Sequence, residues 1–557
     1  MLTNNSMRAT RRFTAPSDVG VVRRRARVAL VLAVLVTLAV TGLIAQLLAA
    51  SMPLAFGLIA TAVALLVLVW VWRRPVRGVY VLFAAAVVQE VGYSAYQYPD
   101  DLGAYVPFFQ DISTWTHIKG VSLSLAELFM ALVLLIWLLK GIAERNLRFT
   151  KGTLMLPLGL YMLMILVGEL HGLASGGNIT LSLWEVRAQV YMFVAYLLAC
   201  NLIKTRREID VLVWIVLLGA GIKGIQGAIR YFLVLGGSLH GAESLFPHEQ
   251  SFFFNAFLTL TPILFLYGGS RRLKRAALAL LPFVLVSDIA NNRRAGILAL
   301  GVGLVMLLLI TLFAHPARRR LVVALLCLGA VIWIPYYNIY KTKSGLLAEP
   351  ARAVYSNSHP NPRDASSNLY RDNENADLMF TMKTSPIIGF GFGKNFDTPY
   401  PLANISGIYI FWNLLPHNSI LWIWMRMGTV GYVIFWLLIG AVIMQGMRLA
   451  RRLRDPYLKG LAAFIVVMVV QEVVFGYTDL QWTSARNLIT LGVLFALLGK
   501  LSAFAPPEQP NAAELYWPWD RRRWIKLIPS RVAGAGATIA ARAAHTALPR
   551  EDRTGSW

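Results

Sequence analysis

The sequence predicts an all-α, polytopic integral membrane protein with about 14 transmembrane helices, both termini in the cytoplasm and one large outer-face loop. Of its 557 residues, 57% are hydrophobic, and the mean hydropathy is +0.58. A soluble protein of this size could not cover so much apolar surface. The apolar residues also fall into blocks of roughly 20, the length of helix that spans ~30 Å of hydrocarbon. Basic clusters, finally, mark alternate loops between these blocks.

The predicted spans follow one another along most of the chain. The first is counted as a span rather than a cleaved signal, because a second apolar run follows within a few residues and no convincing cleavage site is present. The spans are placed at 28–50, 52–72, 77–96, 121–140, 153–171, 183–203, 209–235, 251–269, 274–290, 295–314, 321–340, 418–447, 458–477 and 484–502.

The orientation follows from the loops, because basic residues concentrate on the cytoplasmic side of membrane proteins. Every second loop is basic, which places both termini in the cytoplasm and agrees with an even number of spans. Topology therefore accounts for most of the net charge of +25, and nucleic acid is not needed as a partner. The basic loop residues are Arg73, Arg74, Arg77, Lys140, Arg145, Arg148, Lys151, Lys204, Arg206, Arg207, Arg271, Arg272, Lys274, Arg275, Arg318, Arg319, Arg320, Arg451, Arg452 and Arg454.

Two further segments are predicted to lie outside the bilayer: an outer loop over residues 341–416 and a C-terminal tail over residues 503–557. The outer loop carries seven Lys or Arg and six Asp or Glu residues, a net charge of +1, and its aromatic residues and the helix-like NADLMFTMK predict that it is ordered. The tail is rich in Trp and Arg and suits the cytoplasmic membrane surface. The predicted regions are a basic N-terminal segment (1–27), a bundle (28–340), the outer loop (341–416), a second part of the bundle (417–502) and the basic tail (503–557). Cys200 and Cys327 lie inside apolar blocks, so neither a disulfide nor a thiolate metal site is expected.

Ionisable residues inside membrane spans are costly, so each is a candidate for function. In the stretch GIKGIQGAIRYF, Lys223, Gln226 and Arg230 recur at helical spacing and form one polar stripe. Two cations on one apolar helix require an anion. Either carboxylates of other spans pair with them, or they bind a phosphate of the substrate. The carboxylates that could do so are Glu90, Glu169 and Glu472.

Three arginines are predicted to lie at the outer face. Arg293 and Arg294 stand in a short turn between two spans, and Arg187 lies at the outer end of another. Arginine on this side runs against the general bias. Either a carboxylate such as Asp288 pairs with the turn, or the guanidinium groups bind phosphate, which they can do in bidentate fashion. Glu185, two residues from Arg187, points to a different face of the helix and is not its local partner.

The stretch LPHNSILWIWMRMGTVG places His417 at the start of a long apolar helix. As a straight helix this apolar run would extend about 46 Å, more than the hydrocarbon thickness, so its first turns are expected to stand outside the bilayer core. Gly428 and Gly431 mark the expected bend. Asn418 or Ser419 is expected to cap the helix. His417 is then either an interfacial histidine with structural partners or a group that accepts a proton.

Three features coincide between residues 285 and 435. An R-x-G-I turn beginning at Arg294 opens a span, the outer loop carries SPIIGFGFGKNF, and the pair His417–Asn418 is followed by a Gly-x-x-Gly pair. Together they resemble the O-antigen ligase/polymerase superfamily of bacterial membrane glycosyltransferases. The chain has Arg293 where that family usually has serine.

The resemblance implies a scaffold similar to the lipid-dependent, GT-C-like glycosyltransferases, with no cofactor and no metal ion. The implied donor is a glycan on undecaprenyl diphosphate at the outer leaflet of the bacterial plasma (inner) membrane. The acceptor is a hydroxyl group of a glycan, a lipid or a protein, and lipid diphosphate leaves.

The residue types suit this chemistry. Preorganised arginines can stabilise a diphosphate leaving group, and Arg294 and Arg187 are the catalytic candidates for that role. His417 is the candidate general base, because imidazole titrates in the right range. The candidate substrate-binding residues are Arg293, Arg371, Asn418, Lys223 and Arg230. The acidic alternatives for the base are Asp372, Glu374 and Asp377.

Three functions agree with these features of the sequence. A ligase, slightly favoured, moves a finished glycan onto an acceptor, whereas a polymerase joins lipid-linked repeat units. A transporter or flippase would move lipid-linked sugars without chemistry. Transporters often consist of repeated halves with broken helices, and this chain shows no such repeat. The single large outer loop, which ends at a histidine, favours chemistry on one face.

Overall fold

The structure is a computed structural model that describes residues 54–90, 108–111, 123–239, 244–407 and 409–505. The chain divides into two units, 1–505 and 506–557, and only the first contains described residues. The predicted span 28–50, the basic N-terminal segment and the tail beyond residue 505 lie outside the described residues. Within them, all regular secondary structure is helical, which confirms the all-α prediction.

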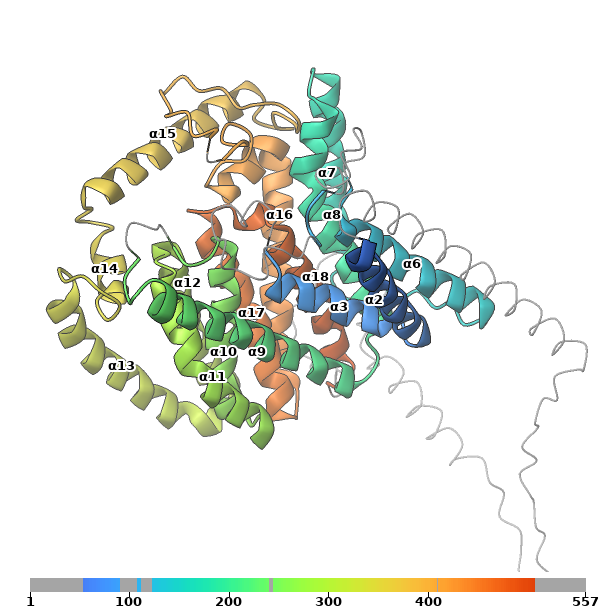
Figure 1. Ribbon diagram of the computed structural model, residues 1–557, viewed down its shortest axis with the longest axis horizontal. Coiled ribbons are helices and arrows are strands. Elements are labelled where there is room, and N and C mark those ends of the chain that lie inside the picture. The colour runs from blue at the N-terminus through green and yellow to red at the C-terminus, as the bar shows by residue number, and fades with distance from the viewer. Residues whose placement is uncertain (1–53, 91–107, 112–122, 240–243, 408, 506–557) are drawn as a thin grey trace, which may run out of the picture. The chain divides into compact units, whose positions relative to one another are not determined.

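The long helices follow the predicted spans closely (Figure 1). Ten helices of the described residues are long and apolar enough to cross a membrane, consistent with a polytopic membrane protein. The α-helices are α2 (Leu54–Arg73), α3 (Val76–Val88), α6 (Leu125–Ala143), α7 (Met155–Ala174), α8 (Ile179–Leu202), α9 (Arg206–Ile229, extended by a π-turn over Arg230–Val234), α10 (Glu249–Tyr267), α11 (Arg271–Ala290), α12 (Arg294–Ala314), α13 (Arg319–Tyr340), α14 (Glu349–Tyr355), α15 (Pro362–Thr384), α16 (Ser419–Arg452), α17 (Pro456–Gly476) and α18 (Ala485–Ser502).

Four predicted spans are not among the ten. The span 28–50 lies outside the described residues, and α2, predicted as the span 52–72, contributes only the shorter apolar stretch Ala62–Arg73. α11 carries Lys274, Arg275 and Asp288, and any 18-residue stretch within it contains all three charges. α3 has only 13 residues, and the residues predicted to extend it lie mostly outside the described part. The total of 14 spans, and the cytoplasmic placement of the termini, therefore remain predictions.

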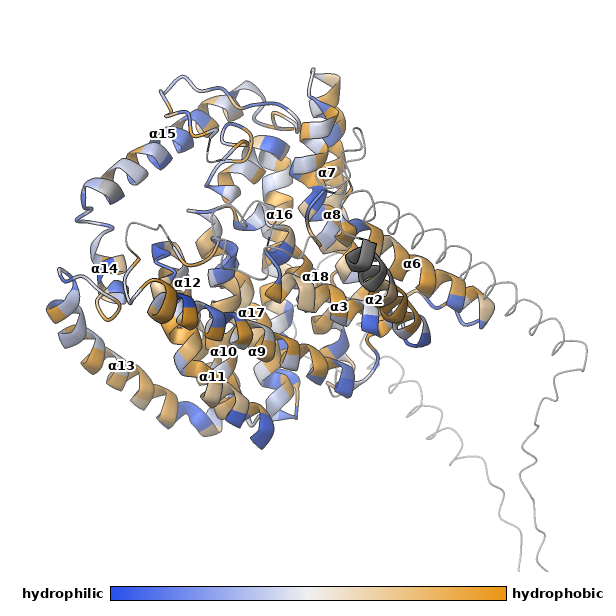
Figure 2. Cartoon of the chain, in the orientation of Figure 1, coloured by the Kyte–Doolittle hydropathy of each residue, from blue (hydrophilic) through white to orange (hydrophobic). Residues whose placement is uncertain are grey.

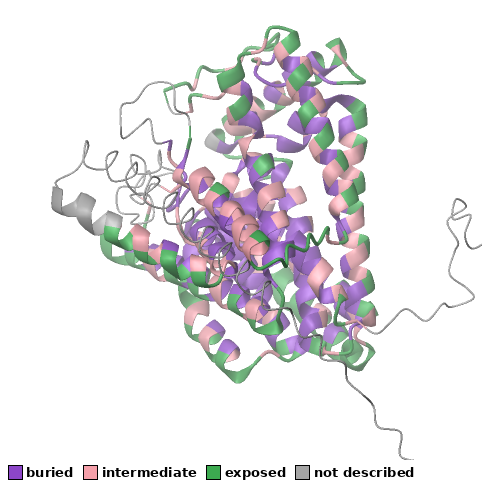
Figure 3. Ribbon diagram, turned by 90° about the vertical axis from the view of Figure 1, so that its right-hand side faces the viewer, coloured by how far each residue is buried: buried purple, intermediate pink, exposed green. Residues whose placement is uncertain are grey.

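The core of the bundle is built from α10, α17 and α18, which bury most of their side chains. Figure 3 shows that the buried residues gather in the interior of the bundle. α18 packs along α8, and α17 packs against α12 and α16. α13 lies at the edge, where it contacts α12 and α14, and Val322 is its only buried residue. Figure 2 shows that its surface is largely apolar, as expected for a helix that faces lipid.

Local signals in the sequence explain where several helices begin. Ser124 with Glu127, and Thr205 with Glu208, form capping boxes at the starts of α6 and α9. At the start of α16, the side-chain oxygen of Asn418 accepts the backbone N–H of Leu421 at 3.0 Å. Asn418 is thus the cap expected from the sequence.

α16 is interrupted where the Gly-x-x-Gly pair predicted a bend. Gly428 has φ 63° and ψ −173°, which breaks the helix between its outer turns and its long inner part. The loop that follows α15 completes the break: the N–H of Thr429 donates to the carbonyl of Pro386 at 2.9 Å, and the N–H of Phe390 donates to the carbonyl of Met425 at 2.7 Å. Irregular backbone at membrane depth is tolerated where protein groups satisfy it in this way.

The glycines of SPIIGFGFGKNF serve this docking. Gly389, Gly391 and Gly393 all have positive φ, between 79° and 98°. A Cβ atom on Gly391 would lie 2.5 Å from the backbone of Gly172 in α7. The sequence suggested that these glycines allow the backbone close to a ligand, whereas the structure shows that they allow it close to α7 and α16.

Replacing Gly391 with alanine is expected to lower the free energy of unfolding by about 1–3 kcal/mol or more, from backbone strain and from the clash with α7. The thermal unfolding midpoint in detergent measures this. Gly407→Ala is the matched control, because a Cβ at Gly407 meets nothing within 4 Å. Equal midpoints for the two variants would contradict the assigned role of Gly391.

Candidate active site

His417 lies immediately before α16, where the outer loop returns to the bundle, and Glu374 of α15 holds it. The Nδ1 atom of His417 lies 3.1 Å from a carboxylate oxygen of Glu374, and the backbone N–H of His417 donates to the same carboxylate at 2.9 Å. Glu374 is 1% exposed, whereas the His417 side chain is 20% exposed. A buried carboxylate on Nδ1 favours the tautomer in which Nδ1 carries the proton, which leaves Nε2 free to accept one.

Tyr370 forms the other wall around this histidine. Its ring meets that of His417 nearly edge-on, with centroids 5.7 Å apart. Burial, and the nearby carboxylates of Glu374 and Asp377, raise the pKa of the Tyr370 hydroxyl. The hydroxyl therefore stays protonated near neutral pH and can donate a hydrogen bond.

His417 opens into a cleft of about 460 Å³, here named the arginine cleft. Arg294 comes from the start of α12, Arg371 from α15, and Asn418 from the start of α16. The structure thus brings together four residues that the sequence selected as site candidates. The full lining is Arg294, Ala295, Leu298, Asn357, Asn368, Arg371, Asp372, Asn375, His417, Asn418, Val474, Tyr477 and Thr478.

Arg294 is oriented by polar groups on one side. Its guanidinium donates to Ser356 and to Asn368, each at 3.3 Å, and lies 3.6 Å from the carboxylate of Asp364. The charge of Arg371 is close enough to oppose that of Arg294. An arrangement of this kind attracts an anion that can lie between the two guanidinium groups.

Arg371 makes no hydrogen bond and no ion pair within 4 Å with another described residue, and its Nε atom is buried without a partner there. Its positive charge nevertheless acts on the carboxyl group of Asp479. Burial raises the pKa of Asp479, but the charges of His248, Arg293 and Arg371 lower it by more, so that the pKa lies below its usual value. Asp479 therefore stays ionised and stabilises the cations without closing the cleft.

A second cleft, of about 480 Å³, is also lined by His417 and is here named the neutral cleft. It shares His417 and Arg371 with the arginine cleft. Hydroxyl, amide and apolar side chains provide the rest of its lining, and Arg371 is the one Lys or Arg among the described residues that line it. The full lining is Ser366, Ser367, Leu369, Tyr370, Arg371, Asn373, Pro401, Ala403, Ile405 and His417.

Arg187, the third catalytic candidate, does not line either cleft. Its Nε lies 3.1 Å from Glu127 of α6, its guanidinium lies over the ring of Trp184, and Asp111 is 3.9 Å away. Arg187 therefore pairs with a carboxylate of another helix, which is the structural role rather than the phosphate-binding role that the sequence allowed for such arginines. Glu185, which the sequence excluded as the local partner of Arg187, pairs elsewhere.

The deeper cations also have partners inside the bundle. Lys223 is 1% exposed and lies 3.0 Å from Glu90 of the segment after α3, one of the carboxylates that the sequence offered for this pairing. Arg230 donates to the carbonyl of Leu245 at 2.6 Å. Arg293 donates to the hydroxyl of Ser244 at 2.8 Å. None of these three cations lines the arginine cleft or the neutral cleft.

A buried ion pair that contacts the SPIIGFGFGKNF loop was not selected from the sequence. Arg426 of α16 and Glu185 of α8 are both fully buried, and their charged atoms lie 2.7 Å apart. The same carboxylate accepts the indole N–H of Trp422 at 3.0 Å and the backbone N–H of Gly393 at 2.7 Å. Arg426 also donates to the carbonyl of Gly391 at 2.9 Å. The pair therefore fixes the SPIIGFGFGKNF segment, here named the glycine loop, to the helices beneath His417. The sequence feature that could have revealed this pair is an arginine within an apolar helix.

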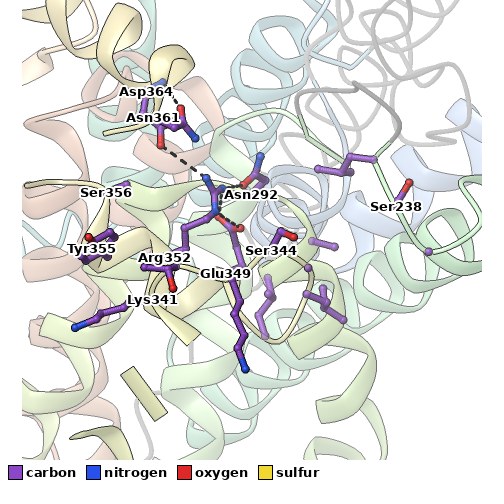
Figure 4. A pocket seen from close by; sticks show the side chains of 18 of the residues that line it. Ser238, Asn292, Lys341, Ser344, Glu349, Arg352, Tyr355, Ser356, Asn361 and Asp364 are labelled. Carbon is purple, nitrogen blue, oxygen red and sulfur yellow. Dashed lines mark hydrogen bonds and ion pairs between the residues drawn. The ribbon is translucent and has the colours of Figure 1, made fainter. Parts of the chain in front are cut away.

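The largest cavity described, about 750 Å³, lies elsewhere, between the α11–α12 turn, α14 and the loop before it (Figure 4). Its arginine, Arg352, pairs with Glu349 at 2.8 Å and donates to Asn292 at 3.0 Å. None of the residues selected from the sequence lines it. Size alone therefore does not identify the site, and we place it where His417 and two arginines converge.

Comparison with known proteins agrees with the motifs. Residues 276–436 match the family described as O-antigen ligase, a range that contains Arg294, Arg371, Glu374 and His417. The match confirms the resemblance to the O-antigen ligase/polymerase superfamily and, with the apolar helices, supports a ligase- or polymerase-like membrane glycosyltransferase. No curated protein matches the chain.

Proposed function

We propose that this chain, whose residues 276–436 match the O-antigen ligase family, transfers a glycan from undecaprenyl diphosphate to an acceptor hydroxyl on the outer face of the bacterial plasma membrane. The observation that carries the proposal is the convergence of Arg294, Arg371 and His417 on one cleft, with Glu374 behind the histidine. A ligase is favoured over a polymerase, and the partners are the lipid-linked donor, the acceptor and the bilayer.

The histidine supplies the base. Glu374 accepts the Nδ1–H of His417, so Nε2 presents its lone pair to an acceptor hydroxyl. The carboxylate also stabilises the imidazolium that forms when the proton arrives. Glu374, one of the acidic alternatives for the base, is thus assigned a positioning role. Asn418 uses its side-chain oxygen as the helix cap, and its NH₂ group remains available to orient the imidazole or a sugar.

The arginines supply the electrostatic stabilisation. As the bond between the sugar and the diphosphate breaks, negative charge grows on the leaving group, and guanidinium groups held in place lower the energy of that state. Arg294 is held by Ser356 and Asn368, whereas Arg371 makes no hydrogen bond to another described residue and can direct its donors at the ligand. In this proposal the two arginines carry the role that a divalent cation has in other diphosphate enzymes, so transfer is expected to continue in EDTA.

The test uses purified protein in lipid nanodiscs with undecaprenyl-diphosphate-linked oligosaccharide extracted from the source membranes. Released lipid diphosphate and transferred glycan are both measured, in EDTA, across a panel of acceptors. Release and transfer by the wild type support the proposal, and the acceptor that is used separates a ligase from a polymerase. Binding of the donor without release, across the whole panel, would contradict it and favour a transporter.

Arg371→Ala is expected to reduce kcat by roughly 10²–10³-fold, the typical effect of removing one preorganised donor from a developing anion. Arg371→Lys is expected to recover only part of the loss, because lysine cannot bind phosphate in bidentate fashion. Lys383→Ala is the matched control, since Lys383 is exposed on the same helix and lines neither cleft. An Arg371→Ala enzyme as active as the control would remove Arg371 from the site.

A further inference from the structure

The turn that leads into Arg294 has an unusual backbone. Asn292, two residues before Arg294, has φ 56°, in the left-handed region that residues other than glycine seldom adopt. Asparagine tolerates this region better than most residues do, yet such a conformation persists only where its surroundings hold it. The direction in which the start of α12 presents Arg294 therefore depends on the groups that hold this turn.

Arg352 of α14 supports this turn from outside the arginine cleft. Its guanidinium donates to the side-chain oxygen of Asn292 at 3.0 Å. Two of its N–H groups also donate to the carboxylate of Glu349, at 2.8 and 2.9 Å. Figure 4 shows the side chains of Asn292, Glu349 and Asp364 around that of Arg352. A bidentate pair fixes the plane of a guanidinium group, so Arg352 is itself held in place while it holds Asn292.

A buried carboxylate also joins Arg352 to Arg294. Asp364, in the first turn of α15, lies 3.6 Å from the guanidinium of Arg294 and 3.7 Å from that of Arg352. Ser356, which accepts a hydrogen bond from Arg294, directly follows the last residue of α14. Arg294 lines the arginine cleft and Arg352 lines the large cavity, so the two arginines share a partner across the wall between these spaces.

We propose that Arg352 is a positioning residue for Arg294. By holding Asn292 and Asp364, it sets the direction in which Arg294 presents its guanidinium to the diphosphate. The inference rests on the proposed function, because it concerns how the arginine cleft binds the donor. It also gives the polar wall of the large cavity a use that needs no ligand, since the arginine in that wall already has protein partners.

Positioning by Arg352 can be distinguished from a long-range effect of its charge. Arg352→Ala is expected to raise the Kd for undecaprenyl diphosphate by about tenfold, a typical coupling between residues that share partners. Arg352→Lys keeps the positive charge but loses the planar fork that holds Glu349 and Asn292 together. Most of the loss is therefore expected to remain in the lysine variant, whereas a long-range effect of charge would restore the wild-type Kd and overturn the inference.

A double-mutant cycle tests whether Arg352 acts through Arg294. The Kd for undecaprenyl diphosphate is measured with the purified full chain in lipid nanodiscs, and the thermal unfolding midpoint confirms that each variant is folded. A residue that acts only through Arg294 has nothing to position once Arg294 is removed. Adding Arg352→Ala to Arg294→Ala is therefore expected to change the Kd by less than about twofold. Adding it to Arg371→Ala is expected to produce the full effect of about tenfold.

Two further variants complete the set. Asn292→Gly removes the acceptor that Arg352 holds, and glycine adopts φ 56° without strain, so this variant keeps the inference testable if Arg352→Ala fails to fold. It is expected to raise the Kd by about threefold or more. Lys343→Ala is the control, because Lys343 is an exposed cation of the same large cavity and lies over the ring of Tyr340. It is expected to keep the wild-type Kd.

The outcomes separate this inference from the proposed function. Wild-type Kd values in both Arg352→Ala and Asn292→Gly would overturn the inference and leave the proposed function standing. An undiminished effect of Arg352→Ala in the Arg294→Ala background would do the same. An Arg294→Ala protein that binds undecaprenyl diphosphate as tightly as the wild type does would overturn the inference together with the role proposed for the arginine cleft.

Discussion

Replacing His417 with alanine is expected to reduce glycan transfer by roughly 10²–10⁴-fold, the usual contribution of a positioned general base. Donor binding is expected to persist, because Arg294 and Arg371 hold the diphosphate without the imidazole. The measurement pairs the rate of lipid diphosphate release with the Kd for the donor. A fall in kcat at constant Kd identifies a group that acts in the transition state rather than in ground-state binding.

Two further variants make this result specific. Glu374→Gln keeps the shape of the partner of His417 but removes its charge, so a smaller loss is expected, together with a change in the pH–rate profile. His359→Ala is the histidine control, because His359 lines the large cavity and neither cleft, and it is expected to retain wild-type activity. Full activity in His417→Ala, or an equal loss in both histidine variants, would contradict the role of His417.

Replacing Arg426 with alanine is expected to lower the free energy of unfolding by about 3–5 kcal/mol, because it leaves the carboxylate of Glu185 buried without its cation. The loss includes the bonds that Arg426 makes to the carbonyls of Gly391 and Leu414. The glycine loop would then lose its attachment beneath His417. The thermal unfolding midpoint in detergent and the fraction recovered as a monodisperse peak measure the effect.

The control for this prediction is Arg451→Ala, an exposed arginine at the other end of the same helix. The double variant Arg426→Met with Glu185→Met is expected to recover much of the stability, since replacing both members of a buried pair removes the uncompensated charge. An Arg426→Ala protein as stable as Arg451→Ala would show that the pair contributes little to the fold.

Much of the fold followed from local sequence, because apolar blocks of membrane length predict helices irrespective of their neighbours. The expected spans match the described helices from α2 onward. The break in α16 was predicted by Gly428, and the cap by Asn418, since both effects act within a few residues. What fills the break was not predictable, because the loop around Gly389 reaches it from about 40 residues away in the chain.

The site was predictable in part, because the order of spans and loops predicts which loops share a side of the membrane. Arg294, Arg371 and His417 stand in a turn and a loop that the charge pattern predicts on the same side of the membrane, and the structure brings them to one cleft. The other cations were harder to interpret from the sequence. Whether Arg187 or Lys223 meets a ligand or a carboxylate depends on which helices are neighbours, and the partners, Glu127 and Glu90, lie on segments distant in sequence.

The most direct test of the central claim is a cryo-EM structure of the protein in nanodiscs with undecaprenyl diphosphate bound. We predict density for the diphosphate between the guanidinium groups of Arg294 and Arg371, with His417 on the side where a sugar would be attached. Density for the diphosphate in the large cavity beside Arg352, with the arginine cleft unchanged, would contradict it.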